Sequence, residues 1–350
     1  MPRVFRFPLF QWRWICIFQL VVFLGWGTIG TSSSVLSRFL DRRQKGRQRF
    51  RDCWDVLKGV DLAGRVFLVT GCYRGLGAAT TRALLSANAK VIMTGRNEQR
   101  LQDFCAQLVA EHQFDPTLID ARQAMDLGDL ASVQNFARFV QKNHAKIDGL
   151  ILNAGVMATP TGTTTRQGLE MQMGINCVGH FLLAKMLAPM TRRQVWVSSR
   201  AHSWYKARPV PLFNKRRAPR INLKAIFDHS YNGWMRYQQS KLGNILLAKA
   251  FAARYPHLET ASVSPGMVAT HIYRHGAVVA LFGMISHILP GFQTPEQGCK
   301  TQVYCAITPS LETGGYYHAC QVTRPAEAAK IKQDAQDFFD FCNEQTRHFQ

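Results

Sequence analysis

Apolar runs of five or six residues alternate with amphipathic stretches along most of this 350-residue chain. The run "RVFLVT" at 65–70 is typical of a buried strand, and "GCYRGLGAATTRALLSA" directly after it indicates a glycine turn that opens a helix. Further strands are expected over 90–95, 147–155, 193–199 and 258–264, and further helices over 97–112, 130–143, 168–190 and 232–254. Strands that alternate with helices predict an α/β fold with a doubly wound parallel sheet, in one domain over about 62–346.

The N-terminal segment predicts a membrane anchor. No charged residue occurs from Trp14 to Ser37, and 24 helical residues would span about 36 Å, enough for a bilayer core of about 30 Å. Three arginines precede this segment and seven Lys and Arg follow it by residue 51, so the body of the chain is expected in the cytosol. A cleaved signal peptide is the alternative, because the densest apolar part is short and a Thr/Ser-rich tail follows.

We therefore divide the first part of the chain into a short tail over 1–13, a transmembrane anchor over 14–37 and a basic linker over 38–61. The linker's positive charges could contact anionic lipid headgroups. A buried helix in a globular core is a weaker explanation of the apolar segment, because the arginine-rich linker leads away from it.

Composition disfavours several classes of protein. A hydrophobic content of 47% suffices for a packed core and excludes a mostly disordered chain. The nine cysteines include no Cys-x-x-Cys pair, which disfavours a disulfide scaffold or a zinc site, and we expect no metal. Of the net charge of +21, residues 1–65 carry +8 and residues 204–226 carry +7 without any acid. Because the charge is so localised, and aromatic residues are not interleaved with basic ones in the body, we expect no nucleic acid partner.

Glycines after the first expected strand indicate a dinucleotide site. Gly71, Gly75 and Gly77 lie between a strand and a helix. Glycine there allows a tight turn and lets a pyrophosphate approach the N-terminus of the helix. The motif alone is weak evidence, but its position directly after the first strand strengthens it.

The end of the second expected strand bears on the choice of cofactor. A cofactor without a 2′-phosphate is usually held by an acid at this point, whereas here Gly95 is followed by Arg96. Arg74, inside the glycine turn, adds a second guanidinium. Two arginines and no carboxylate favour NADP(H) over NAD(H), the alternative being two ordinary surface arginines in an arginine-rich chain.

A second chemical candidate lies in "RYQQSKLGN", residues 236–244. Tyr237 and Lys241 are four residues apart and would lie on one face of a helix, although this spacing alone is a frequent accident. Hydride transfer between an alcohol and a carbonyl needs a proton delivered to, or taken from, the same oxygen. A phenol with a pKa of about 10 is a weak base at neutral pH, but an adjacent ammonium and a positive nicotinamide ring favour the phenolate.

Seven motifs occur in the order seen in the short-chain dehydrogenases/reductases, and the chain resembles that family from about residue 62 to its end. They are "TGCYRGLG", "MDL", "NAG", "GINCVGHF", "VSSRAHS", "RYQQSK" and "SPGMVAT". "GLEMQMGINCVGHFLLAKML" and "TPEQGCKTQVYCA" are most similar to the microsomal retinol dehydrogenases and the WW-domain oxidoreductase, although we recognise no WW domain here. The resemblance implies a Rossmann-type sheet with helices on both faces. With the anchor, it implies a single-pass protein of the endoplasmic reticulum membrane with its catalytic domain in the cytosol.

The resemblance also implies roles for the matching residues. Tyr237 would be the general acid/base, and Lys241 would bind the nicotinamide ribose and lower the pKa of the tyrosine. Ser199 would polarise the substrate oxygen, with Ser198 as the second choice, and Asn176 would hold a water in a proton relay. Besides Tyr237 and Lys241, the cofactor-binding residues would be Gly71, Arg74, Gly75, Leu76, Gly77, Arg96, Asp126, Leu127, Asn153, Ala154, Gly155, Pro265, Gly266 and Thr270.

The chain departs from the family's simplest pattern in three places. A basic insert over 204–226 could admit an acidic substrate, contact the membrane or be a solvated loop. Tyr73 stands in the glycine turn where relatives often have a small polar residue. The apolar stretch 276–292 lies where the family places its substrate-covering segment, and suits a lipophilic substrate, membrane contact or a core helix. We interpret His180 and His202 as structural.

The sequence therefore predicts a membrane-anchored, NADP(H)-dependent oxidoreductase that acts on a lipophilic alcohol or carbonyl, such as a retinoid, sterol or fatty aldehyde. A cofactor-binding regulatory or scaffold protein without turnover is the alternative. Such a protein would not need to keep Asn176, Ser199, Tyr237 and Lys241 together. Beyond the substrate and the membrane, a second copy of the chain is a candidate partner.

Overall fold

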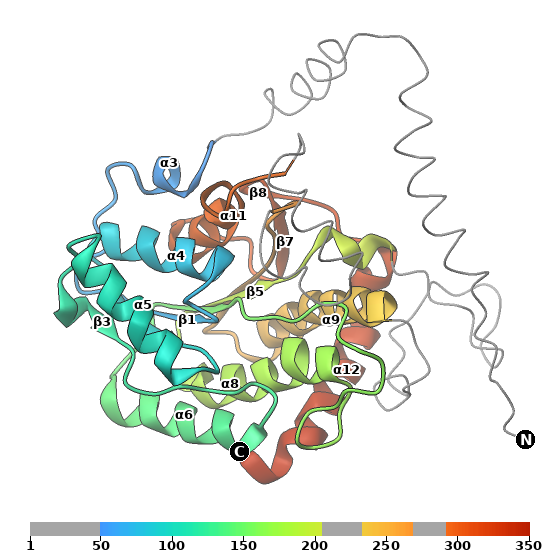
Figure 1. Ribbon diagram of the computed structural model, residues 1–350. Coiled ribbons are helices and arrows are strands. Elements are labelled where there is room, and N and C mark those ends of the chain that lie inside the picture. Colours follow the sequence, from blue (N-terminus) through green and yellow to red (C-terminus); the bar gives the residue numbers. More distant parts are fainter. Residues whose placement is uncertain (1–49, 205–232, 269–291) are drawn as a thin grey trace, which may run out of the picture. The chain divides into compact units, whose positions relative to one another are not determined.

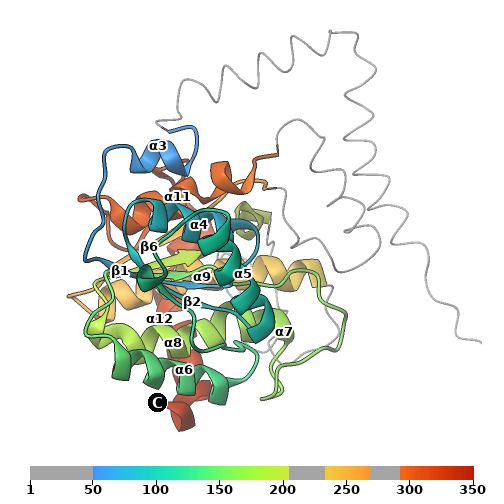
Figure 2. The ribbon, with the colours of Figure 1, turned by 60° about the vertical axis from the view of Figure 1, so that its left-hand side comes forward.

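The computed structural model describes residues 50–204, 233–268 and 292–350, which belong to one compact unit (Figures 1 and 2). Six expectations fall outside the described residues: the tail over 1–13, the anchor over 14–37, the linker up to residue 49, the insert beyond residue 204, the apolar stretch up to residue 291, and Thr270.

The strands of the described chain form one sheet in the order β3-β2-β1-β4-β5-β6-β7-β8. Neighbouring strands from β3 to β7 are parallel, and β8 runs antiparallel to β7 at one edge. Their bounds are β1 Val66–Thr70, β2 Lys90–Thr94, β3 Ile119–Asp120, β4 Gly149–Leu152, β5 Arg193–Val197, β6 Glu259–Ser264, β7 Gly315–His318 and β8 Gln321–Val322. The expected doubly wound parallel sheet is confirmed, and its direction of winding reverses between β1 and β4.

Helices cover both faces of the sheet, and this explains why the central strands β1, β4, β5 and β6 are almost entirely buried (Figures 1 and 2). The core on one face includes residues of α3, α4, α5 and α11, and the core on the other includes residues of α6, α8, α9 and α12. The helices are α3 Cys53–Leu57, α4 Gly75–Ser86, α5 Glu98–Ala110, α6 Leu130–Asn143, α7 Met171–Met173, α8 His180–Leu187, α9 Gly233–Arg254, α11 Pro295–Ile307 and α12 Lys332–Thr346. A π-helix over Gly174–Gly179 joins α7 to α8, and 3-10 turns lie at Pro116–Leu118, Ala188–Met190, Arg200–Trp204, Glu327–Lys330 and Arg347–Phe349.

The compact unit begins before residue 62. Helix α3 lies in the stretch expected as a linker, yet Cys53 is fully buried and Val56 is 7% exposed. The helix packs against α4 and α11, and the Asp52 side chain caps its N-terminus by accepting from the amide of Asp55. The boundary expected at residue 62 therefore lies inside the compact unit.

One helical stretch of the described chain, Met171–Met190, is long and apolar enough to cross a membrane, but 78% of its most apolar window is buried inside the fold. It includes α8, which packs against α6 and α12. Its apolar character is therefore that of a core helix.

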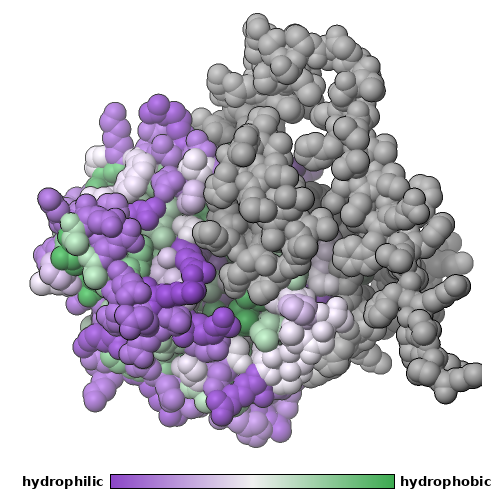
Figure 3. Space-filling view, in the orientation of Figure 1, coloured by the Kyte–Doolittle hydropathy of each residue, from purple (hydrophilic) through white to green (hydrophobic). Residues whose placement is uncertain are grey.

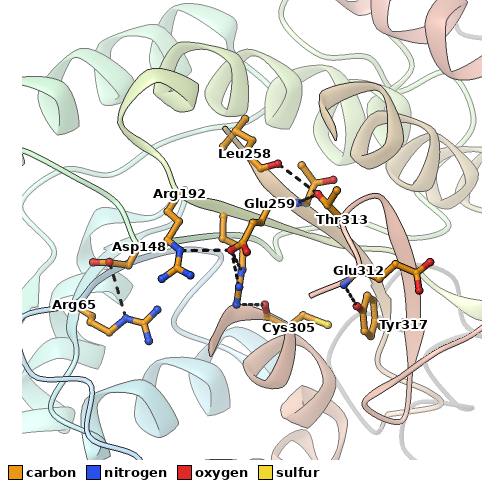
Figure 4. A network of polar contacts seen from close by, with 11 residues as sticks. Arg65, Asp148, Arg192, Leu258, Glu259, Cys305, Glu312, Thr313 and Tyr317 are labelled. Carbon is orange, nitrogen blue, oxygen red and sulfur yellow. Dashed lines mark hydrogen bonds and ion pairs between the residues drawn. The ribbon is translucent and has the colours of Figure 1, made fainter. Parts of the chain in front are cut away.

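Ion pairs fasten the amino ends of the strands, at the edge where β5 and β6 begin (Figure 4). Arg193, 1% exposed, donates to Glu259 Oε2 at 2.9 Å from Nε and 2.6 Å from Nη2, and to the carbonyl of Cys305 at 3.0 Å. Arg65, just before β1, lies 4.0 Å from the carboxylate of Asp148, just before β4. These contacts fix the strands at the end opposite to the one where the expected site residues follow.

Helix α12 packs closely on α9 because of a glycine. A Cβ placed on Gly243 would lie 2.7 Å from Phe338 Cε1 and 2.8 Å from Cys177 Sγ, so no larger residue fits without displacing its neighbours. The next residue of α12, Phe339, contacts Phe181 of α8 edge-on, with ring centroids 4.9 Å apart. Helix α12 thus supports α9, which carries Tyr237, and α8, which follows the π-helix of Asn176.

We expect Gly243→Val to lower the free energy of unfolding by about 1–3 kcal/mol, because the added side chain overpacks the contact with Phe338. Denaturant titration measures the loss. Phe338→Leu in the same chain should reduce the cost of Gly243→Val, as a double-mutant cycle would reveal. An equal cost with either residue at position 338 would contradict the assignment to this contact.

Candidate active site

The expected site residues gather where parallel strands end. Thr70 closes β1 before the glycine turn, and Leu152 closes β4 before the "NAG" motif. Val197 and Ser264 close β5 and β6, just before the "SS" and "PG" motifs. Ligands of open α/β sheets bind at this edge, beside the point where the winding reverses.

The three glycines of the turn are required for different reasons. Gly71 has φ +66°, and its amide donates to the carbonyl of Thr94 at 2.8 Å, which ties the turn to the end of β2. Gly75, the first residue of α4, has φ +50°. A Cβ on Gly77 would lie 2.1 Å from the carbonyl oxygen of Gly71, so only glycine lets α4 approach the turn this closely. Leu76, between them, is half-buried.

The N-terminus of α4 lacks a side-chain cap, unlike α3, α5, α6, α7 and α11. Arg74 occupies the N-cap position without a capping hydrogen bond. By contrast, Asn97, Asp129 and Thr294 cap α5, α6 and α11 with their side chains. The first amides of α4 are therefore available to an acceptor from outside the helix, as a pyrophosphate would provide.

The residues expected around the adenosine lie beside this turn. Arg74 and Arg96 are exposed, and neither forms an ion pair with a carboxylate of the described residues. Asp126 accepts from the amide of Gly128 at 2.8 Å, so part of its hydrogen-bonding capacity shapes its own loop. Leu127 is 6% exposed and belongs to the hydrophobic core that also includes residues of α8.

Asn176 connects the loop after β4 to α9. It lies in the π-helix Gly174–Gly179, a deviation from α-helical geometry that often marks a functional site. Its side-chain oxygen accepts from the amide of Val156 at 2.9 Å, and its amide group donates to the Val156 carbonyl and to Ser240 Oγ at 3.0 and 2.9 Å. Ser240 donates in turn to the carbonyl of Tyr237 at 2.8 Å. Both side-chain amide hydrogens of Asn176 are thus used in positioning, and a water bound to this residue would have to donate to one of its oxygens.

Lys241 is buried against the end of β5. Its side chain is 3% exposed, and Nζ donates to the carbonyl of Val197 at 2.9 Å. Burial lowers the pKa of Lys241 to about 8. Nζ lies 5.6 Å from the centroid of the Tyr237 ring, and a Cβ on Gly155 would lie 3.5 Å from Nζ. The structure therefore brings the lysine, the tyrosine and the "NAG" loop together.

The two candidate serines have different surroundings. Ser198 is 2% exposed and its hydroxyl donates to the carbonyl of Lys241 at 2.6 Å, so it helps to hold α9. Ser199 is half-buried, and its Oγ accepts from the amide of Ala201 at 3.1 Å. The Ser199 hydroxyl hydrogen has no acceptor among the described residues, which leaves it available to a substrate oxygen.

Tyr237 lies at the boundary between core and surface. It is 7% exposed and clusters with Met157 and Ala201. Trp234, one helical turn earlier, stacks on it with ring centroids 5.9 Å apart and an interplanar angle of 28°. The Tyr237 ring therefore has apolar neighbours, and the Lys241 ammonium lies 5.6 Å from its centroid.

A buried link between Thr70 and His180 supports the site and could not be found from the sequence. His180 is fully buried, and burial lowers its pKa to about 3, so the ring is neutral. Its Nδ1 lies 3.2 Å from the carbonyl of Asn176, which can only accept, and its Nε2 therefore accepts from the Thr70 hydroxyl at 2.9 Å. Thr70 Oγ1 also accepts from the amides of Asn153 and Ala154, at 2.9 and 3.0 Å. The histidine thus joins the end of β1 to the helix of Asn176.

A second residue that sequence reasoning missed stands beside the "PG" motif. Gly266 has φ +89°, and a Cβ there would lie 2.6 Å from Gln293 Nε2, so the Gln293 amide covers this turn. Gln293 donates from its backbone to the carbonyl of Met267 at 2.8 Å. Its side-chain Oε1 is buried, and no described residue forms a hydrogen bond with it. Pro265 is half-buried at the same place.

The fold and this edge of the sheet define a Rossmann-type oxidoreductase. The short chain dehydrogenase family profile matches residues 65–200, and the chain belongs to this family. The family resemblance that the motifs suggested is therefore confirmed.

Several relatives share most of the chain. It is 34% identical to a Streptomyces lividans protein named "Probable oxidoreductase" over 290 residues, which cover 78% of this chain and 91% of that one. It is 33% identical to retinol dehydrogenase 14 of Mus musculus over 282 residues, covering 74% and 78%. A crystal structure of an uncharacterised protein from Mycobacterium paratuberculosis, 26% identical, matches 82% of this chain and 95% of that one with a TM-score of 0.63.

The pKa of Lys241 predicts a pH dependence of stability. Its folded-state pKa, about 8, lies below the unfolded value of about 10.5, so the folded protein binds this proton less tightly than the unfolded chain. Without cofactor, the contribution of Lys241 to stability should therefore increase as the pH rises from about 8 to about 10.5. Urea midpoints of the wild type and Lys241→Met at several pH values test this: the difference between them should change across that window. A constant difference would contradict the lowered pKa.

Proposed function

We propose that this chain is an NADP(H)-dependent oxidoreductase that interconverts a lipophilic alcohol and its carbonyl, of the retinoid, sterol or fatty aldehyde class. The observation that carries the proposal is the buried Lys241 ammonium, 5.6 Å from the Tyr237 ring and beside Gly155 at the carboxyl edge of the sheet. A cation held at this place favours the phenolate form of the tyrosine and can bind ribose hydroxyls.

The residues at this edge fit NADP(H). The uncapped N-terminus of α4 suits a pyrophosphate, and the exposed guanidinium groups of Arg74 and Arg96 suit a 2′-phosphate. No acid stands directly after β2, where a cofactor without that phosphate would need one: the next residues are Gly95 and Arg96. When bound, the cofactor supplies or accepts the hydride.

The protein's own residues would hold the reacting oxygen and move its proton. Ser199 would donate its hydroxyl hydrogen to the substrate oxygen, and Tyr237 would protonate that oxygen in reduction or take its proton in oxidation. Lys241 would stabilise the phenolate that remains after proton donation. Asn176, bonded to Val156 and Ser240, would keep α9 aligned with the cofactor edge.

The surface beside Tyr237 favours an apolar substrate. The described surface in Figure 3 is mostly hydrophilic. Large apolar side chains that are nevertheless exposed in the described chain are Trp54, Val109, Trp234, Met267 and Val322. Two of them flank the site: Trp234 stacks on Tyr237, and Met267 follows Gly266. The names of relatives such as retinol dehydrogenase 14 agree with a lipophilic substrate.

A membrane location completes the proposal. The uncharged stretch over 14–37 would anchor the chain in the endoplasmic reticulum membrane, and the basic residues after it would keep the folded domain in the cytosol. A substrate that partitions into the bilayer would then be concentrated near the enzyme. The domain arrangement is thus a tail, an anchor, a basic linker and one oxidoreductase domain.

We expect Tyr237→Phe to abolish turnover, because no other group would exchange the proton, while NADPH binding persists. Purified full-length protein is assayed with retinal, a steroid ketone and a fatty aldehyde, and NADPH binding is followed by fluorescence. Ser199→Ala should cost about 10²- to 10⁴-fold in kcat. Ser198→Ala, which removes a contact that holds α9, is the comparison: it should lower the melting temperature and cost less in kcat than Ser199→Ala. If Tyr237→Phe stays fully active, the catalytic assignment of Tyr237 fails. If the wild type turns over none of the three substrates, a cofactor-binding protein without this chemistry becomes the better description.

Arg96→Ala should raise the Kd for NADPH far more than the Kd for NADH. A lost charge-assisted contact of about 1.5–3 kcal/mol corresponds to about 10- to 150-fold. Titration of both cofactors against wild type and variant measures the two ratios. Equal losses for both cofactors would remove the 2′-phosphate assignment.

A further inference from the structure

The place where a cofactor-binding acid would stand is filled by an aromatic ring from the glycine turn. A Cβ built on Gly95, the residue after β2, would lie 2.2 Å from Tyr73 Cε1, 2.9 Å from Cδ1 and 3.1 Å from Cζ. Contacts under about 3.0 Å are not tolerated, so any side chain at position 95 has to displace the Tyr73 ring. Gly95 and the Tyr73 ring therefore pack directly against each other.

Backbone hydrogen bonds hold the segments of Tyr73 and Gly95 in place. The amides of Gly71 and Cys72 donate to the carbonyl of Thr94 at 2.8 and 3.3 Å, which ties the segment leading into Tyr73 to the end of β2. The carbonyl of Gly95 accepts from the amide of Met125 at 3.1 Å. Because the backbone is tied on both sides, only rotation of the Tyr73 side chain can make room at Gly95.

The same ring forms part of the wall of a small hollow. The hollow has a volume of about 210 Å³ and is lined by Tyr73, Arg74, Arg100, Asp103, Phe104 and Gln107. Arg74 and Arg100 are exposed and form no ion pair with a carboxylate of the described residues. Asp103, the one acid of the lining, accepts from Gln99 Nε2 at 2.8 Å. Two guanidinium groups therefore face one carboxylate, and the lining is net positive.

We propose that Tyr73 determines cofactor specificity: its ring occupies the volume that an acid at position 95 would need, and with Arg74 and Arg100 it forms an anion-binding wall for a 2′-phosphate. The proposal rests on the NADP(H) function above and adds two residues to it. An acid at the end of β2 would bind two ribose hydroxyls and repel a phosphate. By excluding that acid sterically, Tyr73 makes the preference for the phosphorylated cofactor resistant to a single substitution at position 95.

A set of variants tests this in the full-length protein, with thermal stability and the Kd values for NADPH and NADH as readouts. Gly95→Asp alone should lower the melting temperature and raise the Kd for both cofactors, because the ring is displaced. Tyr73→Ser with Gly95→Asp should regain stability and bind NADH at least about tenfold more tightly than Gly95→Asp alone, as one recovered hydrogen bond to a carboxylate implies. Arg100→Ala should weaken NADPH binding more than NADH binding.

Tyr73→Phe with Gly95→Asp is the matched control, since it keeps the ring and removes only the hydroxyl. It should behave like Gly95→Asp alone. If Gly95→Asp binds NADH equally well with or without the Tyr73 ring, the role of Tyr73 is overturned while the NADP(H) function stands. If the wild type binds NADPH and NADH equally, the cofactor assignment fails, and the specificity role of Tyr73 fails with it. In that case the melting temperature of Gly95→Asp, with and without the Tyr73 ring, still tests the packing contact independently of cofactor binding.

Discussion

The hydrogen bond from the Lys241 ammonium to the carbonyl of Val197 is the interaction on which the site depends. An ammonium that is 3% exposed pays a large desolvation cost, and one backbone carbonyl does not offset it fully, as the lowered pKa records. Asn244 donates to the same carbonyl at 2.9 Å, and Ser198 donates to the carbonyl of Lys241 at 2.6 Å. Helix α9 and strand β5 are thus joined by three polar contacts around one charge, and the ammonium keeps hydrogen-bonding capacity for a ribose.

This arrangement requires rigid support from the neighbouring helices and from the strands. On the helical side, Gly243 lets Phe338 of α12 pack directly on α9, so α9 cannot move away from β5 without opening the core. On the strand side, His180 joins Thr70 at the end of β1 to the carbonyl of Asn176. A neutral, buried histidine is well suited to this role, because it donates at one nitrogen and accepts at the other without carrying a charge into the core.

The sequence predicted the elements whose signal is local and missed those that depend on distant contacts. The strands β1, β2, β5 and β6 lie inside the expected segments, and β1 and β2 show the reason most clearly, because burial on both faces leaves a nearly continuous apolar run. By contrast, β3 and α3 have only two and five residues, too few for a distinctive pattern. The π-helix around Asn176 interrupts a segment whose apolar pattern predicts one continuous helix. The site shows the same division. The spacing of Tyr237 and Lys241 is visible in the chain, whereas the hydrogen bond that occupies the Ser198 hydroxyl joins it to a residue 43 positions away.

The same limit applies to Gly95, because the sequence shows there only that no acid directly follows the second strand. A glycine after a strand is compatible with many causes, and the sequence does not show that Tyr73, 22 positions earlier, lies on it. In the structure, the Tyr73 ring occupies the volume that an acidic side chain at position 95 would need. Cofactor choice in this chain then depends on packing as well as on charge, because the arginines can attract a phosphate only where no acid competes with it. Specificity of this kind combines an attractive element, the guanidinium groups, with a steric element that rejects the alternative.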